Sequence, residues 1–119
     1  MTKPILFHNP DCSKSRATLT LLDERKVEYA VRLYLELPLD LSELQMLASI
    51  LEDGANSLLR EADAIKKDPS LNPSAMSLKE RLELIANHPN LMQRPILMHR
   101  GVAKIGRPPE SVLALLDDI

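Results

Sequence analysis

The amino-acid sequence predicts one α/β domain over residues 1–119, with helices flanking a mixed four-stranded sheet. Three observations predict this class. A short apolar run at residues 5–7 precedes an amphipathic helix and a second extended segment, two capping boxes mark helices in the middle of the chain, and two more extended segments lie within residues 94–105. With 119 residues, 45% of them apolar, the chain can bury a core without a metal ion or disulfide.

The first third of the chain predicts a β-α-β unit. Residues 5–7 are continuously apolar, as in a central strand buried on both faces. A helix follows from Ser13 and ends near residues 25–26, whose two cations suit the negative helix end. Its apolar stripe consists of Ala17, Leu21 and Leu22, with Leu19 nearby. Residues 27–35 alternate imperfectly and predict a second strand, parallel to the first because the crossover is long.

The middle of the chain predicts a helical insertion. After Pro38, a capping box at residues 40–43 starts a helix that Gly54 ends as the residue after its C-cap. Its inward face consists of Leu44, Leu47, Ala48 and Leu51. Residues 58–60 predict a short helix capped by Asn56 or Ser57, and residues 66–74 a surface loop. A second capping box at residues 77–80 starts a helix that ends near residues 88–89, with Leu78, Leu82 and Ile85 on one face.

The last third predicts a β-β-α unit. Residues 94–98 form the third strand, Gly101 turns the chain, and residues 102–105 form an antiparallel fourth strand. Residues 107–110 open a last helix, in which Val112, Leu113 and Leu116 face inward. A helical insertion between a β-α-β half and a β-β-α half is the order of a thioredoxin-like domain.

The composition excludes several classes of function. Fifteen basic and 17 acidic residues give a net charge of −2, so nothing favours non-specific binding to nucleic acid. No apolar run approaches the roughly 18 residues of a membrane helix. Residues 1–4 lead directly into a strand, without the apolar segment of a signal peptide. One cysteine forms no internal disulfide. We therefore expect a cytoplasmic protein.

Bound cofactors are not expected either. One cysteine and three scattered histidines make no zinc site, and a chain with three glycines has no glycine-rich nucleotide loop.

Cys12, the only cysteine, is the main candidate for chemistry. Residues 9–11 are turn-forming, so Cys12 lies between a strand and a helix start, where the free backbone N–H groups of residues 13–16 can bind an anion. Arg16 adds positive charge one helical turn further on. Such surroundings favour a thiolate, which is a nucleophile. The alternative is a small buried apolar residue, but the polar neighbours of Cys12 favour the reactive thiol.

Two nearby residues are candidates to assist the thiol. His8 could stabilise a thiolate as an imidazolium or carry its proton, although a lone histidine beside a turn is more often solvated. Ser15 could donate a hydrogen bond to the sulfur, or equally could satisfy the backbone of the first helical turn.

Four arginines lie at element starts or between elements: Arg16, Arg60, Arg94 and Arg107. Arg25 and Arg81 fall inside helices and are interpreted as solvated. Arginine pairs bidentately with tetrahedral oxyanions, but each of these arginines, taken alone, is more simply interpreted as a surface charge. Sequence spacing cannot bring them together around Cys12; only the fold can. The Arg94-Pro95 bond is a candidate cis peptide.

Five motifs together resemble one known family. They are His8-Asn9-Pro10-Asp11-Cys12-Ser13-Lys14-Ser15-Arg16, Tyr34-Leu35-Glu36, Leu58-Leu59-Arg60, Asn90-Leu91-Met92-Gln93-Arg94-Pro95-Ile96 and Ile105-Gly106-Arg107-Pro108. In this order they resemble the glutaredoxin-coupled arsenate reductases (ArsC-like, thioredoxin fold), and more narrowly the short bacterial YfgD-type branch. The resemblance covers nearly the whole chain.

That resemblance implies a role for each candidate. Cys12 would attack arsenate, Arg60, Arg94 and Arg107 would bind the oxyanion, and His8 and Ser15 would support the thiolate. Pro95 would be a cis-proline facing the active-site turn. Glutathione would act as co-substrate, displacing the Cys12 adduct as a mixed disulfide that an external glutaredoxin resolves. A chain with one thiol needs this second thiol from outside. We expect a monomer.

Two alternatives stay open. One is a non-enzymatic module like the Spx-type regulators that bind RNA polymerase, although those usually carry Cys-x-x-Cys where this chain has Cys12-x-x-Ser15. The other is a glutathione-dependent thiol reductase with a different substrate.

Overall fold

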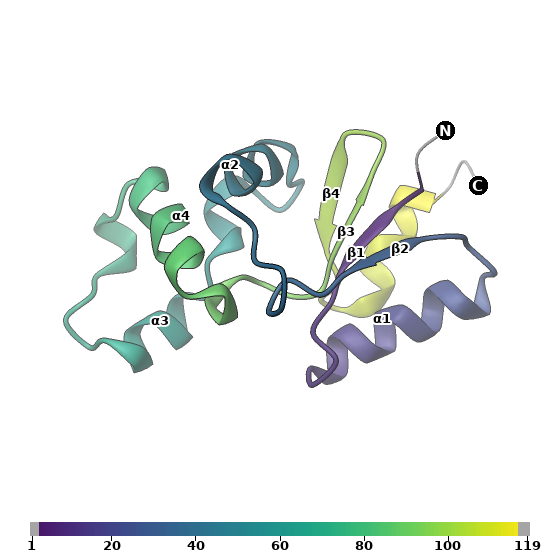
Figure 1. The fold of residues 1–119 in the computed structure, drawn as a ribbon, viewed down its shortest axis with the longest axis horizontal. Coiled ribbons are helices and arrows are strands. Elements are labelled where there is room, and N and C mark those ends of the chain that lie inside the picture. Colours follow the sequence, from purple (N-terminus) through teal and green to yellow (C-terminus); the bar gives the residue numbers. More distant parts are fainter. Residues whose placement is uncertain (1–2, 117–119) are drawn as a thin grey trace.

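The computed structural model describes residues 3–116, in which four strands form one mixed sheet (Figure 1). The strands are β1 (Ile5–Phe7), β2 (Ala30–Arg32), β3 (Ile96–His99) and β4 (Val102–Ile105), in the spatial order β2-β1-β3-β4. β2 runs parallel to β1, whereas β3 is antiparallel to both β1 and β4. The predicted mixed sheet is therefore confirmed. The expectation for the first two residues lies outside the described part of the chain.

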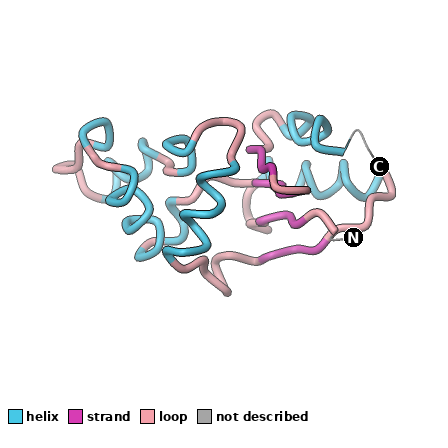
Figure 2. Tube along the Cα trace, turned by 90° about the horizontal axis from the view of Figure 1, so that it is seen from above, coloured by secondary structure: helices cyan, strands magenta, loops and turns pink. Residues whose placement is uncertain are grey.

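Helices cover both faces of this sheet. The α-helices are α1 (Ser13–Glu24), α2 (Leu41–Ile50), α3 (Glu61–Lys67) and α4 (Leu78–Asn87). The 3₁₀-helices are η1 (Ala55–Leu58), η2 (Pro73–Ala75), η3 (Pro89–Leu91) and η4 (Pro109–Leu116). Figures 1 and 2 show α1 and η4 together against the sheet, and α2, α3 and α4 grouped at the other end of the molecule. This is the predicted thioredoxin-like arrangement with its helical insertion.

Alternation along the strands divides the core into two clusters. Leu6 and the next residue, Phe7, point to opposite faces because successive side chains of a strand alternate. The cluster under α1 and η4 consists of Leu6, Leu22, Val27, Leu97, Val112 and Leu116. The larger cluster, under the helical insertion, includes Phe7, Tyr34, Leu44, Leu47, Leu58, Leu82, Ile85, Met92, Ile96 and Ile105. The central strands β1 and β3 are thus covered on both faces, as predicted for residues 5–7, whereas the edge strand β2 is largely exposed.

Both predicted capping boxes form. At α2, the backbone N–H of Glu43 donates to Asp40 Oδ1 at 2.8 Å, and that of Asp40 donates to Glu43 Oε1 at 3.2 Å. Ser77 and Glu80 make the same reciprocal pair at α4. Each pair satisfies two backbone donors that a helix start otherwise leaves free, so the helix starts at residues 41 and 78 are locally encoded.

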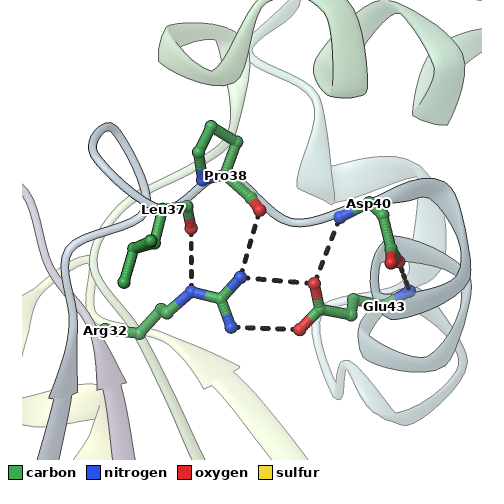
Figure 3. Close-up of polar contacts among 5 residues, drawn as sticks. All are labelled: Arg32, Leu37, Pro38, Asp40 and Glu43. Carbon is green, nitrogen blue, oxygen red and sulfur yellow. Dashed lines mark hydrogen bonds and ion pairs between the residues drawn. The ribbon is translucent and has the colours of Figure 1, made fainter.

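Arg32 connects the end of β2 to the start of α2 (Figure 3). Its guanidinium makes a bidentate ion pair with Glu43, at 3.0 and 3.2 Å, and donates to the carbonyls of Leu37 at 2.8 Å and Pro38 at 3.1 Å. Two of these four hydrogen bonds go to backbone carbonyls of the loop itself. The loop that carries Tyr34 into the core is therefore held at both ends.

The predicted second strand over residues 27–35 is wrong in length. β2 contains only residues 30–32, and the chain then turns, because the N–H groups of Glu36 and Leu37 both donate to the Leu33 carbonyl. Tyr34, which lies outside the alternating apolar positions, enters the core at 1% exposure, whereas Val31 and Leu35 of that pattern are exposed.

Gly54 does not end α2, which stops at Ile50. Leu51 instead adopts an extended conformation and bridges to Ala103 of β4, and Gly54 precedes η1 with φ +100°. The bridge from Leu51 to β4 therefore takes the place of one more turn of α2.

The segment after η1 also differs from the prediction. Residues 61–67 form α3, which the sequence analysis missed, and residues 73–75 form η2 within the predicted loop. Arg60 lies at the N-cap of α3 instead of inside a short helix.

Some expected faces are also corrected. Ala17 and Leu78 are exposed, and α1 instead buries Ser15, Thr18 and Leu22. The last helix forms, but as the 3₁₀-helix η4. Arg25 is solvated as expected.

Arg81 is buried, at 3% exposure, contrary to its assignment as a solvated residue. Its guanidinium donates to the carbonyls of Pro73 at 2.7 Å and Asn56 at 2.6 Å, and pairs with Glu61 at 2.5 Å. These bonds satisfy the terminal Nη1 and Nη2 groups, as a buried cation requires, whereas Nε has no partner within residues 3–116. Arg81 thus ties η1, α3 and η2 to α4, although periodicity placed it on a polar face.

Gly106 lies where no side chain fits, because a Cβ atom there would lie 2.7 Å from Pro95 Cγ and 2.9 Å from Thr18 Oγ1. We predict that Gly106→Ala lowers the free energy of unfolding by about 1–3 kcal/mol, as overpacking does, measured by urea denaturation. The variant should also raise the pKa of Cys12, since the next residue, Arg107, donates to its sulfur. Gly101→Ala is the control for the thiol alone: its φ of +76° strains an alanine, but a Cβ there meets nothing within 4 Å and the pKa of Cys12 should stay unchanged.

Candidate functional site

The sheet topology brings three distant segments to one edge. β1 ends at Phe7, opposite Ile96 where β3 begins, and Ile96 is paired with Ile105, where β4 ends. The segments 8–12, 93–95 and 106–107 therefore leave the sheet side by side. This is how Cys12 and Arg107, 95 residues apart in the chain, come into contact.

Cys12 is the N-cap residue of α1, with φ −95° and ψ 124°, and is partly exposed. Its N–H donates to the Asn9 carbonyl, and its own carbonyl accepts from Arg16 N, both at 3.0 Å. Arg107 Nη2 donates to Cys12 Sγ at 3.7 Å. The sulfur thus lies at the positive end of a 12-residue helix, as the sequence predicted.

The pKa of the Cys12 thiol lies below its ordinary value. Partial burial alone raises this pKa. The backbone N–H of Ser15, the guanidinium of Arg94, the backbone N–H of Lys14 and the charge of Arg107 lower it and outweigh the burial. All four favour the thiolate by hydrogen bonding or by charge. The site therefore holds an accessible nucleophile beside two guanidinium groups.

Arg94 and Arg107 support each other. Arg107 Nε donates to the Arg94 carbonyl at 2.9 Å while its Nη2 reaches the sulfur, and Arg94 Nη1 donates to the Asn90 carbonyl at 2.8 Å. Pro95 is buried, follows a cis peptide bond as predicted, and accepts a backbone hydrogen bond from Gly106 at 2.9 Å. The two arginines are thus held by backbone carbonyls, Arg94 by one in η3 and Arg107 by one just before β3.

Arg60 lies in the same neighbourhood but is held by other side chains. Arg60 Nε pairs with Asp63 at 2.5 Å, and Arg60 Nη1 donates to Gln93 Oε1 at 3.2 Å. Its backbone N–H donates to the Leu91 carbonyl, at 2.8 Å. Its charge acts on the Tyr34 hydroxyl together with those of Arg94 and Cys12. Arg60 therefore faces the site without hydrogen-bonding the sulfur.

His8 and Ser15 hydrogen-bond each other beneath the turn. Ser15 Oγ is 2.7 Å from His8 Nδ1 and accepts from the backbone N–H of Asn9 at 3.0 Å, and both side chains are buried. Burial, with the charge of Arg16, lowers the pKa of His8, so the imidazolium is disfavoured at neutral pH. Within residues 3–116, Ser15 acts on the sulfur through its backbone N–H, and its hydroxyl satisfies the turn.

Arg16 braces the turn from outside. It is exposed, and its Nη1 donates to the Pro10 carbonyl at 2.9 Å. Asn9, at 8% exposure, closes the turn from inside, since its Oδ1 accepts from the backbone N–H of Asp11 at 3.0 Å. The predicted turn chemistry of residues 9–11 is therefore present in detail.

Sequence reasoning missed three residues around the arginines. Asp63 and Gln93 hold Arg60, and only the i,i+3 spacing of Arg60 and Asp63 offered a signal. Tyr34 is 1% exposed, and its hydroxyl has no hydrogen-bond partner within residues 3–116 that meets ordinary geometry. Burial raises the pKa of Tyr34, and the nearby charge of Arg94 opposes this. The alternating apolar positions of residues 27–35 leave out Tyr34, which appeared only in the motif Tyr34-Leu35-Glu36 of the family resemblance.

Two recesses of different charge flank the site. One, of about 570 Å³, is lined by Asp53, Asn56, Ser57, Leu59, Glu61, Gln93, Ile105 and Arg107. The other, of about 370 Å³, is lined by Asn9, Asp63, Lys66, Lys67, Asn90, Leu91 and Arg94. We call the second the lysine recess.

Other kinds of site find no support in the described chain. Within residues 3–116, no group of three His, Cys, Asp or Glu side chains could hold a metal ion. None of the helices there is both long and apolar enough to cross a bilayer.

Comparison with known proteins identifies close relatives. The model of the ArsC family matches residues 7–115. The chain is 44% identical over 118 residues to "Uncharacterized protein YfgD" of Escherichia coli strain K12, covering 98% of this chain and 99% of that protein. It is 40% identical over 113 residues to an arsenate reductase of Haemophilus influenzae, covering 94% and 97%.

A solved structure and a more distant relative complete the comparison. An arsenate reductase from Vibrio cholerae superposes with a TM-score of 0.86 at 35% identity, covering 97% of this chain and 99% of that one. The global transcriptional regulator Spx of Streptococcus pneumoniae strain R6 is 28% identical over 111 residues, covering 93% and 84%.

The ionised thiol predicts a specific pH profile. The rate of Cys12 alkylation by iodoacetamide should reach half its maximum below the pH of a free thiol, because the pKa of Cys12 is lowered. Arg107→Ala and Arg94→Ala should each move the midpoint upward, by about one unit. Arg25→Ala, which removes an exposed arginine at the other end of α1, should not. An unshifted wild-type midpoint would contradict the proposed environment.

The same lowered pKa links the stability of the protein to pH. The stability contributed by the ionised thiol is fully present above the ordinary pKa and is lost as the pH falls through the folded-state pKa. Wild type should therefore gain stability over Cys12→Ser as the pH rises through that window, measured by urea denaturation.

The unpartnered hydroxyl of Tyr34 predicts an unusual effect on stability. Tyr34→Phe should leave the free energy of unfolding unchanged or raise it, because the change removes a buried hydroxyl whose one neighbour, Asn9, lies outside ordinary hydrogen-bond geometry. Tyr29→Phe is the comparison, since the Tyr29 hydroxyl donates to Asp23 at 2.7 Å. A loss of more than about 1 kcal/mol in Tyr34→Phe would show that its hydroxyl has a partner in solution.

Proposed function

The chain belongs to the ArsC family, and on that premise we propose that it reduces arsenate with the Cys12 thiolate, using glutathione and glutaredoxin as the source of electrons. One observation carries the proposal: the partly exposed sulfur, with its lowered pKa, lies 3.7 Å from Arg107 Nη2. The arginines that hold a thiolate are the same groups that bind a tetrahedral oxyanion. Nucleophile and substrate therefore meet in one charged pocket.

Arg107, Arg94 and Arg60 are proposed to bind the arsenate oxygens. Arg107 keeps its Nε on the Arg94 carbonyl, so its Nη groups are aimed at the space beside the sulfur. Arg60, which pairs with Asp63, supplies a third positive charge from the N-cap of α3. The backbone N–H groups of residues 14 and 15 add donors at the helix start. These donors oppose the repulsion between two anionic reactants.

The first chemical step joins sulfur to arsenic. The Cys12 thiolate attacks the arsenic of arsenate, an S–As bond forms, and one As–O bond breaks to release water after protonation. Arsenic remains pentavalent in this adduct. His8, neutral at neutral pH and bonded to Ser15, is proposed to keep the turn in place during the attack rather than to provide charge.

The second step transfers two electrons. A glutathione thiolate attacks the Cys12 sulfur, the S–As bond breaks, and its electron pair leaves with arsenic as trivalent arsenite. The two sulfurs are oxidised together to a Cys12–glutathione mixed disulfide. A glutaredoxin thiolate then attacks the glutathione sulfur and releases the Cys12 thiolate. The chain has a single cysteine, which is consistent with an external resolving thiol.

The cellular setting follows from the same chemistry. We propose that the protein works as a monomer in the cytoplasm, where glutathione keeps thiols reduced, with no nucleic acid or membrane as partner. Two alternatives keep the same thiol but change its use: a glutathione-dependent reductase acting on another substrate, and an Spx-like regulator, which the 28% identity to such a protein brings into consideration.

Arsenate reduction coupled to NADPH oxidation through glutathione and glutaredoxin tests the proposal. Cys12→Ser should abolish turnover. Arg107→Ala and Arg94→Ala should each lower kcat/KM by about 10- to 100-fold, the effect of losing one hydrogen bond to a charged group. Arg25→Ala, remote and exposed, is the matched control and should retain wild-type activity.

Three other results would contradict the proposal. Full activity of Cys12→Ser would exclude the mechanism. Absence of arsenate turnover by a wild-type protein whose thiol still has a lowered pKa would point to another substrate. Binding to RNA polymerase without turnover would favour the regulator.

A further inference from the structure

The lysine recess is more positively charged than the recess on the other side of the site. Lys66, Lys67 and Arg94 line it against one carboxylate, Asp63. The opposite recess presents Asp53 and Glu61 beside Arg107, and Glu61 is already paired with Arg81. A negatively charged molecule approaching the sulfur is therefore favoured on the lysine side.

Lys66 and Lys67 have no ion-pair partner within residues 3–116. Both are exposed, and their place in the last turn of α3 suits the negative end of the helix. Lys66 acts on Asp63 only through its charge, without an ion pair. The one carboxylate in the recess, Asp63, is already paired with Arg60. Two ammonium groups therefore remain available to a ligand.

Arg94 connects this recess to the nucleophile. Its side chain lines the recess, and its guanidinium also hydrogen-bonds the Cys12 sulfur and lowers the pKa of the thiol. Asn9, three residues before Cys12, lines the same recess. A molecule occupying it therefore lies beside Arg94, the residue that connects the recess to the sulfur. A volume of about 370 Å³ accommodates part of a short peptide.

We propose that the lysine recess binds the carboxylates of the thiol co-substrate, through Lys66 and Lys67, and so delivers a peptide thiol to Cys12. This inference rests on the proposed function, because it assigns a docking place to the second thiol that the reaction needs. Glutathione fits the chemistry, since it carries two carboxylates and one ammonium group and is a net anion at neutral pH. The site thus separates its two substrates: the oxyanion meets the arginines, and the peptide thiol enters from the lysine side.

Thiol–disulfide exchange at Cys12 tests the proposal without arsenate. The Cys12 thiolate attacks one sulfur of a symmetrical disulfide, the S–S bond breaks, a mixed disulfide forms, and the other half leaves as a thiolate. Three disulfides serve as probes: glutathione disulfide is anionic, bis(2-hydroxyethyl) disulfide is neutral, and cystamine is cationic. Their rates with one protein reveal the charge preference of the approach path.

The Lys66→Glu/Lys67→Glu double variant should slow the reaction with glutathione disulfide by about 10-fold or more relative to the neutral probe, since 1.4 kcal/mol of lost attraction corresponds to a factor of ten. Its reaction with cystamine should become faster. With both charged probes, the rates of the Lys66→Gln/Lys67→Gln variant should lie between those of the Lys66→Glu/Lys67→Glu variant and those of wild type. Lys3→Glu, at an exposed residue before β1 and outside the recess, is the control for the single Lys66→Glu variant, which makes the same change of charge. Raising the salt concentration should reduce all these differences.

The proposal is overturned if the double variant changes the rates of all three probes equally, or if Lys3→Glu has the same effect as the recess variants. Alkylation by neutral iodoacetamide shows whether the thiol itself has changed, and it should stay at the wild-type rate in every lysine variant. Failure of arsenate turnover together with charge-selective exchange would reject the arsenate substrate and keep the docking recess. Arsenate turnover with unselective exchange would reject the recess alone.

Discussion

The antiparallel pairing of β3 with both of its neighbours is the constraint on which the site depends. Because β1 ends where β3 begins and β4 ends, three segments far apart in sequence leave the sheet at one edge. The cysteine turn comes from the first segment, and Arg94 and Arg107 come from the other two. A register shift would separate the sulfur from its guanidinium groups and move core side chains to the opposite face at the same time. Burial of the core therefore also sets the position of the nucleophile.

Around that edge, charged groups are held mainly by neutral ones. Arg107 and Arg94 are oriented by backbone carbonyls, and the cysteine turn is closed by Ser15, His8 and Asn9. Neutral partners position a guanidinium without neutralising it. The positive charge thus remains available to the thiolate and to an incoming oxyanion. Arg60 is the exception, because Asp63 offsets part of its charge.

The helical insertion adds both stability and electrostatic asymmetry. The pair of Arg32 and Glu43 fixes the loop after β2, and Arg81 fixes η1, α3 and η2 to α4 through two carbonyls and Glu61. α3 has opposite charges at its two ends: Glu61, paired with Arg81, lines the recess beside Arg107, and Lys66 and Lys67 line the lysine recess. One short helix therefore makes the lysine recess the more positive of the two approaches to the sulfur.

Interactions between residues close in the sequence determined the first strand, the cysteine turn and two of the helix starts. The apolar run at residues 5–7, the turn before Cys12 and the two capping boxes each act over a few residues, so they could be predicted from the sequence and are present in the structure. The resemblance of five motifs to a family added the pairing of Cys12 with particular arginines, which spacing alone does not predict.

The tertiary structure decided the remainder, because the remaining choices involve competition between distant groups. Residues 33–37 turn instead of extending β2, since Tyr34 gains more by entering the core, and Leu51 leaves its helix to pair with Ala103. Arg81 is buried because three acceptors from other segments surround it. The lowered pKa of Cys12 likewise needs Arg94 and Arg107, which only the completed sheet brings within reach.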